Sequence, residues 1–258
     1  METAPLIVIV GETASGKTAL ALELAERLDG EIICADSRTV YTGMDIGTAK
    51  PTEEEQARVP HHLLDVVRPD EHFTAADFKR LANQAIIDIS SRGKLPIMVG
   101  GTGLYVDSLL FDYSFADKSV ERDPQNPHHV AREAAGSKGE MRENTLVFGL
   151  RPDREELRGR ISSRVDAMVA DGLVEETKWL MDNYPTSKAL DSTGYKAFRG
   201  YIQGSLTLDE AKALFIRNDI QLAKRQRTWF KRNNSIHWLD NSGDIVDIAT
   251  TFLNKKAE

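Results

Sequence analysis

Short, continuous apolar runs alternate along the chain with longer segments in which apolar residues recur at helical spacing. Residues 6–10, 31–35 and 95–99 are apolar nearly throughout, as strands are when helices cover both faces of their sheet. Residues 18–28 and 74–92 lie between them and have the period of packed helices. This alternation predicts an α/β fold, a parallel sheet flanked by helices.

The second half of the chain is predicted to be mainly helical. Residues 145–150 have the apolar character of a strand, and residues 153–180 carry a helical stripe, with a second helix expected to begin after Gly172. Residues 208–231 predict a further helix, and residues 236–239 predict a short last strand.

One stretch interrupts this pattern. Residues 113–144 are mostly polar and contain an Asp-Pro turn, an Asn-Pro turn and a glycine-bounded segment. We therefore interpret residues 113–144 as a small insertion. Residues 1–112 and 145–258 together would form one α/β core with C-terminal helices.

The composition narrows the classes of protein that fit. The 258 residues suffice for one large domain with a buried core. With 33 basic and 40 acidic side chains the formal charge is −7, which argues against nucleic-acid binding over the whole surface but allows a local basic site. No apolar run approaches the roughly 20 residues of a membrane-spanning helix, so we expect no membrane partner. Cys34 is the only cysteine, which excludes an internal disulfide and is compatible with a cytoplasmic location.

The residues between the first strand and the first helix match the phosphate-binding motif G-x-x-x-x-G-K-[ST] at every fixed position. Glycines let backbone N–H groups turn toward phosphate oxygens, and the helix N-terminus adds partial positive charge. We expect Lys17 to neutralise the outer phosphate and Thr18 to offer its hydroxyl to Mg²⁺. The predicted phosphate site consists of Gly11, Thr13, Ala14, Ser15, Gly16, Lys17 and Thr18. Because such a loop recognises phosphate geometry, the rest of the ligand stays open.

Two further loops follow strands at the same predicted edge of the sheet, where open α/β sheets bind ligands. Asp36 follows the second strand, and its carboxylate could hold Mg²⁺ indirectly, act as a general base or cap the next segment. Residues 100–105 form a glycine-rich turn after the third strand. Residues 41–51 are too rich in glycine for a helix, and we interpret them as a functional loop.

Several blocks of the sequence together resemble the bacterial tRNA dimethylallyltransferase family, also called tRNA isopentenyltransferases. The blocks occur in the family's order and are residues 13–18, 35–37, 43–51, 60–65, 99–105, 194–196 and 223–226. The resemblance implies a P-loop NTPase-like fold. It also implies transfer of the dimethylallyl group of dimethylallyl diphosphate to N6 of the adenosine 3′ of the anticodon, with release of diphosphate. The implied partners are the anticodon stem-loop of tRNA and dimethylallyl diphosphate, and we expect a monomer.

The resemblance also implies roles for individual residues. Asp36 would accept the proton of the adenine amino group, Thr102 would contact the target nucleotide and Arg164 would contact the diphosphate. Arg160 lies four residues before Arg164 and would share its helix face, although without the resemblance a solvated face with acidic partners would be the default. The implied tRNA-binding residues are Asp36, Ser37, Arg38, Thr39, Thr102, Arg122, Arg132, Lys224 and Arg227. The target adenine is stacked in its loop, so it must be flipped out to react.

A basic stripe near the end of the chain supports an RNA partner. Residues 217–232 carry six basic side chains against one acidic side chain. Lys224, Arg227 and Lys231 fall on one helix face, where they would suit RNA phosphates. Trp229 and Phe230 are either core residues or surfaces on which bases stack.

The chain departs from the family in the insertion that precedes residues 145–150. Family members usually carry a longer helical insertion that helps to clamp the anticodon stem-loop, and here it is reduced. His128 and His129 stand where the family has Gln and Arg, whereas Arg132 matches and Arg122 corresponds to another tRNA-contacting arginine. The reduction favours an alternative acceptor, free AMP, ADP or ATP, as in adenylate isopentenyltransferases. The phosphate loop alone would also suit a small-metabolite kinase. The loss of family arginines would also be compatible with a non-catalytic RNA-binding protein.

Overall fold

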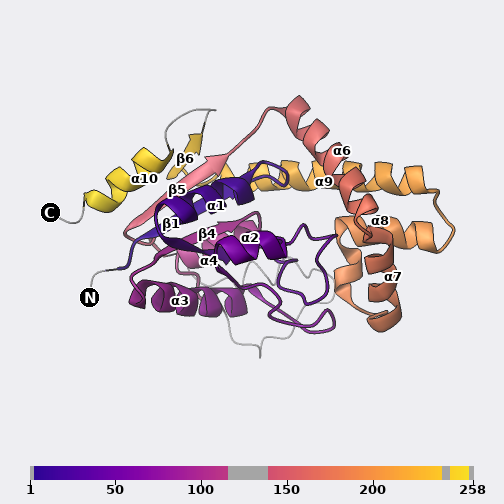
Figure 1. Cartoon of the computed structure of the whole chain (residues 1–258), viewed down its shortest axis with the longest axis horizontal. Helices are drawn as coiled ribbons and strands as arrows, with labels where there is room; N and C mark the ends of the chain where they lie inside the picture. Colours follow the sequence, from indigo (N-terminus) through magenta and orange to yellow (C-terminus); the bar gives the residue numbers. More distant parts are fainter. Residues whose placement is uncertain (1–2, 116–138, 240–244, 256–258) are drawn as a thin grey trace.

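A six-stranded parallel sheet forms the centre of the molecule in the described residues, 3–115, 139–239 and 245–255, of the computed structural model (Figure 1). The strands are β1 (Leu6–Gly11), β2 (Gly30–Cys34), β3 (His61–His62), β4 (Leu95–Gly100), β5 (Thr145–Leu150) and β6 (Ile236–Leu239). Their order is β3-β2-β4-β1-β5-β6, and every neighbouring pair in it is parallel. The predicted α/β fold class is confirmed.

Helices cover the sheet and gather at one end of it (Figure 1). Those packed around the sheet are α1 (Lys17–Arg27), α2 (Glu53–Arg58), α3 (Ala75–Ser91), α4 (Gly103–Leu110) and α10 (Ile245–Asn254). Those at the end are α6 (Arg154–Ala170), α7 (Leu173–Asn183), the 3₁₀ helix Lys188–Asp191, α8 (Thr193–Ile202) and α9 (Leu208–Phe230).

The two faces of the sheet have separate cores, because alternate residues of a strand point to opposite sides. In β1, Leu6, Val8 and Val10 belong to the core that α3 and α4 cover. Ile7 and Ile9 belong to the opposite core, under α1 and α10. All five side chains are completely buried, which explains why this strand has no polar position.

The helices α6 to α9 have a core of their own, built from residues such as Leu180, Tyr195 and Phe215. Met44, from the glycine-rich loop, is fully buried in the same core. The last turn of α9 returns to the sheet, where Phe230 is buried under α3 and α4. The loop and α9 therefore join the helical end of the molecule to the sheet.

Helix ends follow the signals in the sequence. Thr74 caps α3 through a capping box with Asp77, and Gly93 follows its last turn with φ +73°. Gly172, with φ +107°, separates α6 from α7, so the stretch 153–180 is two helices, as the glycine predicts.

Several short elements were not expected from the apolar pattern: α2, α4, α8, α10 and β3. Of these, α2 had a local signal, since Thr52 and Glu55 form a capping box. In the predicted insertion, residues 116–138, which include Arg122 and Arg132, lie outside the described residues. No helix in the described part of the chain is both long and apolar enough to cross a membrane.

Candidate active site

The carboxyl ends of β1, β2 and β4 lie side by side and open into a cavity of about 660 Å³. Val10 pairs with Gly100 across β1 and β4, so the loops that follow these strands begin at the same level of the sheet. Residues 13–18 of the phosphate loop line this cavity, as do Asp36, Thr102 and Arg164. The structure thus brings the predicted catalytic and phosphate-binding residues together, except Gly11, which is not part of the cavity lining.

The phosphate loop ends at a residue whose backbone conformation only glycine adopts easily. Gly16 has φ +95°, and α1 begins directly after it, so the first N–H groups of the helix lie at the cavity. Lys17 Nζ donates to the Glu12 carbonyl oxygen at 2.5 Å. Burial lowers the pKa of Lys17 to about 8, although the nearby Asp36 carboxylate acts in the opposite direction. A phosphate ligand would supply the counter-charge that favours the protonated lysine.

The two arginines expected on one face of α6 both reach the phosphate loop. Arg164 Nη2 donates to Thr13 Oγ1 at 2.7 Å. Arg160 Nη1 donates to the Ser15 carbonyl oxygen at 3.3 Å, while its Nη2 pairs with Glu156 at 2.6 Å. Arg164 also has an acidic partner, since its Nη2 donates to Asp219 Oδ2 of α9 at 2.5 Å. Both arginines therefore contact a carboxylate as well as the phosphate loop.

Two buried polar atoms at the phosphate loop have no hydrogen-bond partner within the described residues: Ser15 Oγ and Arg164 Nε. Both residues line the cavity. Buried polar atoms in folded proteins are normally hydrogen-bonded, and both of these can donate a proton. They fit an anion with several acceptor oxygens, as a diphosphate has.

Gln226 of α9 joins the phosphate loop to the loop after β4. Its side chain accepts a hydrogen bond from Thr13 N at 2.8 Å and donates one to the Gly101 carbonyl oxygen at 3.0 Å. The backbone N–H of Thr13, predicted to face phosphate, is therefore bonded to Gln226, and its hydroxyl accepts from Arg164. In this structure Thr13 therefore bonds to Gln226 and Arg164, two side chains that line the cavity.

The segment that follows β2 is organised by Thr102. Ser37 N donates to Thr102 Oγ1 at 3.0 Å, so this hydroxyl makes no capping bond to α4, which it precedes. Arg38 N donates to Asp36 Oδ1 at 2.8 Å, the local turn that aspartate commonly forms. Asp36 thus shapes the chain with one oxygen while its side chain lines the cavity, so a structural and a chemical role are compatible.

Mg²⁺ was expected at Thr18, and the donor set of the cavity allows a particular kind of site. Among the residues that the structure describes, no three His, Cys, Asp or Glu side chains come together as metal ligands. The Thr18 hydroxyl and the Asp36 carboxylate line the same cavity. Mg²⁺ is usually bound through one or two protein oxygens, waters and substrate phosphates. The residues present fit that mode of binding.

The residues predicted to bind tRNA are only partly brought together. Ser37, Arg38 and Thr39 line the cavity beside Asp36. Lys224 is exposed on α9, as the basic stripe requires. Arg227 is instead held by Glu12, which is 2% exposed: Nη2 donates to Oε2 at 2.9 Å, and Nε donates to Oε1.

The two aromatic residues of the stripe differ in their surroundings. Phe230 is 2% exposed and belongs to the core, which settles its role. Trp229 is partly buried and lines the cavity; its Nε1 donates to Asp107 at 2.9 Å, and Arg232 lies 5.4 Å from its ring centroid. Stacking of a base on Trp229 stays a prediction.

The match to known proteins decides the family. The IPP transferase model matches residues 39–140 and 125–233. The chain belongs to the IPP transferase family. The tRNA dimethylallyltransferase of Geobacter metallireducens is 40% identical, over 98% of this chain and 97% of its own length. Among solved structures, the tRNA isopentenylpyrophosphate transferase of Bacillus halodurans has a TM-score of 0.84 and 35% identity, covering 99% of this chain and 98% of its own.

A more distant member shares the architecture as well. A eukaryotic dimethylallyltransferase acting on tRNA has a TM-score of 0.80 and 25% identity, over 99% of this chain and 78% of its own. The alignment with the Geobacter protein spans 301 positions, more than the 258 residues of this chain, so that relative carries residues absent here. The two family matches overlap at residues 125–140, inside the segment predicted to be a reduced insertion.

Asp219 and Gln226 also line the cavity, and neither was predicted as a site residue from the sequence. Both belong to α9, whose buried face includes Phe215, Asp219 and Ala223 at intervals of four residues. A carboxylate at an apolar position of a helix was therefore a signal for Asp219. Gln226 had a weaker one, since it lies only in a block of the family resemblance.

Proposed function

We propose that the protein transfers the dimethylallyl group of dimethylallyl diphosphate to N6 of the adenosine 3′ of the anticodon in tRNA, releasing diphosphate. One observation carries the proposal: a single cavity has Lys17 and Arg164 at its phosphate loop and Asp36 with Thr102 at the neighbouring loops. Membership of the IPP transferase family and the activities for which relatives are named support it. Since tRNA is the acceptor, the proposed location is the cytoplasm.

The phosphate side of the cavity suits a diphosphate leaving group. When the bond between the allylic carbon and the diphosphate oxygen breaks, negative charge develops on the diphosphate. Lys17 and Arg164 line the cavity at the phosphate loop, so they would stabilise negative charge on a diphosphate bound there. When bound by the Thr18 hydroxyl and the diphosphate, Mg²⁺ would supply further positive charge to the leaving group.

The opposite side suits an amine acceptor. The exocyclic amine of adenine is a weak nucleophile, and its proton must leave as the new N–C bond forms. Asp36 would accept that proton, while Thr102 holds the following segment through Ser37 N. The adenine would enter the cavity flipped out of its stack, which also keeps water from the allylic carbon.

A transfer assay tests the proposal directly. Purified protein, Mg²⁺ and radiolabelled dimethylallyl diphosphate are incubated with unmodified tRNA or, separately, with AMP or ATP. We expect label in tRNA, and none when the adenosine 3′ of the anticodon is replaced by another base. Label in the free nucleotide alone would instead assign the protein to adenylate isopentenyltransferases. No label in either, with phosphorylation of a small acceptor by ATP, would favour a kinase.

Replacing Asp36 with Asn tests the proposed base. The variant should lose about 10²- to 10⁴-fold in turnover, the usual contribution of a general base, and still bind diphosphate. Asp182→Asn is a matched control, because Asp182 is exposed on α7, away from the cavity lining. Unchanged turnover in Asp36→Asn would remove Asp36 from this role.

A further inference from the structure

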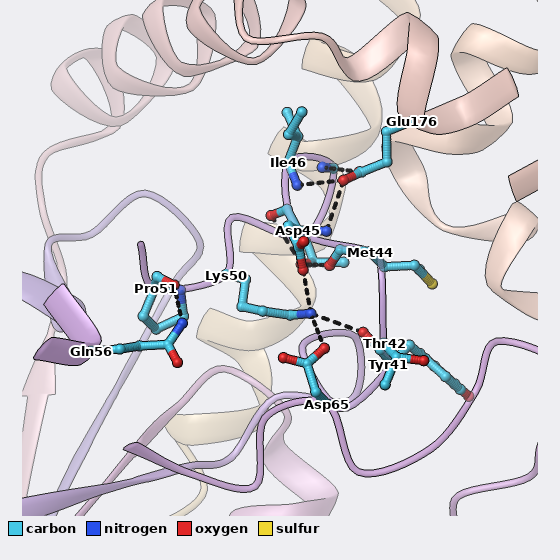
Figure 2. Close-up of polar contacts among 12 residues, drawn as sticks. Tyr41, Thr42, Met44, Asp45, Ile46, Lys50, Pro51, Gln56, Asp65 and Glu176 are labelled. Atoms are coloured by element: carbon cyan, nitrogen blue, oxygen red, sulfur yellow. Dashed lines mark hydrogen bonds and ion pairs between the residues drawn. The ribbon is translucent and has the colours of Figure 1, made fainter. Parts of the chain in front are cut away.

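One wall of the cavity is held by two charged residues that the mechanism above does not use, Glu176 and Lys50 (Figure 2). The wall is the segment 45–51 of the glycine-rich loop. Its residues that line the cavity are Gly47, Thr48, Ala49 and Pro51.

The Glu176 carboxylate, on α7, accepts hydrogen bonds from the backbone at the start of this segment. Its Oε2 accepts from Asp45 N and from Ile46 N, both at 2.8 Å. Its Oε1 accepts from Gly47 N at 2.7 Å and from the Tyr195 hydroxyl at 2.6 Å. An ionised carboxylate has about four acceptor positions, so this one is fully used in fastening the loop to α7 and α8.

The Lys50 ammonium gathers the other end. Its side chain is 3% exposed, and Nζ donates to Asp45 Oδ1 at 2.5 Å, to Asp65 Oδ1 at 2.6 Å and to the Tyr41 carbonyl oxygen at 2.9 Å (Figure 2). Asp65 N donates in turn to the Thr39 carbonyl oxygen at 3.3 Å. Lys50 therefore ties the wall to the chain that runs on from Asp36.

The loop packs tightly against α7 and α8 at Gly47. A Cβ on Gly47 would lie 2.6 Å from Cζ of Tyr195 and 2.9 Å from Cδ1 of Leu173. Because both neighbours are fully buried, neither has room to give way. The backbone of the wall is thus fixed by close packing as well as by charge.

The position of this wall points to the acceptor rather than the diphosphate. Thr39, between Asp36 and Tyr41, is 5% exposed and lines the cavity, and its hydroxyl has no hydrogen-bond partner within the described residues. Such a group calls for a polar ligand. The phosphate loop has separate supports, Gln226 and Arg164.

We propose that Glu176 and Lys50 are positioning residues for the acceptor base. They hold segment 45–51 and the chain at residues 39–41, so that the base is presented to Asp36 without either residue touching it. This inference rests on the proposed function, since that function supplies the acceptor. It predicts that disturbing the contacts of Glu176 or Lys50 raises the KM for tRNA and leaves the KM for dimethylallyl diphosphate nearly unchanged.

Glu176→Gln is the first test. The amide keeps the size of the side chain but leaves one oxygen for four donors and turns an NH₂ group toward N–H groups. We expect faster hydrogen exchange at the amides of residues 45–47, a KM for tRNA raised about tenfold and a KM for dimethylallyl diphosphate within about twofold of wild type. Glu175→Gln is the matched control: Glu175 is exposed in the same first turn of α7, so any effect on the helix dipole is shared.

Gly47→Ala disturbs the same wall by a steric clash with Tyr195 and leaves the Glu176 carboxylate intact. It should therefore give the same selective rise in the KM for tRNA. Equal changes in both KM values, or a lower melting temperature with neither KM changed, would overturn the inference. So would unaltered exchange at residues 45–47 in Glu176→Gln. If wild-type protein transferred no dimethylallyl group to tRNA, the proposed function would fail, and the exchange measurement would still decide whether Glu176 holds the segment.

Discussion

Arg164 of α6 and Asp219 of α9 form an ion pair, with Nη2 2.5 Å from Oδ2, and the Asp219 side chain is 3% exposed. Arg164 also donates to Thr13 in the phosphate loop. The pair therefore sets the guanidinium against the loop through the packing of α6 and α9. The position of a cation at the phosphate loop thus depends on how α6 and α9 pack against each other.

Replacing Asp219 with Asn should make stability depend more strongly on the ligand. Without its carboxylate partner, the largely buried Arg164 loses its counter-charge, and we expect the free energy of unfolding to fall by about 2–3 kcal/mol. Added diphosphate supplies a new counter-charge, so it should stabilise the variant more than wild type. Urea unfolding with and without diphosphate measures both effects. Asp209→Asn is the control, because Asp209 is an exposed first-turn residue of α9. If diphosphate raised the free energy of unfolding equally in wild type and in both variants, the prediction would be contradicted.

The lowered pKa of Lys17 predicts a pH dependence of diphosphate binding. In the free protein the lysine is protonated below pH of about 8 and neutral above it. Bound diphosphate favours the charged form and raises the pKa, so affinity should be full below pH of about 8 and fall as pH rises beyond it. Calorimetric titration with diphosphate across this range measures the midpoint. Lys17→Arg stays charged throughout, and it should lose this midpoint; the same midpoint in both proteins would assign the titration to another group.

Gln226→Ala should separate the two loops that this side chain joins. It removes the bonds to Thr13 N and to the Gly101 carbonyl oxygen, each worth about 1 kcal/mol. We expect kcat/KM for transfer to fall about tenfold or more, since both sides of the cavity lose alignment. Gln221→Ala, an exposed position on the same helix, should leave steady-state kinetics unchanged. A fall in both variants would point to α9 itself.

Most of the sheet was predictable, because every strand except the two-residue β3 is an apolar run in the sequence. β1 and β4 are apolar runs, and the phosphate motif and the block 99–105 mark the loops that follow them. The parallel arrangement then brings those loops to one edge. The order of the strands, with β4 between β1 and β2, comes from pairings distant in sequence that no local pattern reveals.

The supports of the site were harder to predict than the site itself. Glu176 lies 129 to 131 residues from the amides that it binds, and Gln226 lies 213 residues from Thr13. Each looks like an ordinary polar helix residue in the sequence. Arg227 is a further example. Its helical spacing indicates an RNA-facing stripe, whereas in the structure its guanidinium pairs with Glu12, a buried acid distant in the sequence.

Lys224 and Arg227 should therefore respond differently to removal, although both belong to the predicted stripe. Lys224→Ala removes an exposed charge, so it should weaken tRNA binding and reduce the slope of log K against log salt by about one. Arg227→Ala leaves Glu12 buried without its partner, which should cost about 3–5 kcal/mol of unfolding free energy and leave the salt slope unchanged.

Salt-dependent tRNA binding and urea unfolding of the two variants separate these effects. Adding Glu12→Gln to Arg227→Ala should recover part of the lost stability, because the unpaired charge is gone while the cavity left by the arginine stays. A reduced salt slope in Arg227→Ala with unchanged stability would show instead that Arg227 leaves Glu12 to bind phosphate. In that case the stripe would act as the helical spacing predicts, and the pair with Glu12 would be a resting arrangement that tRNA displaces.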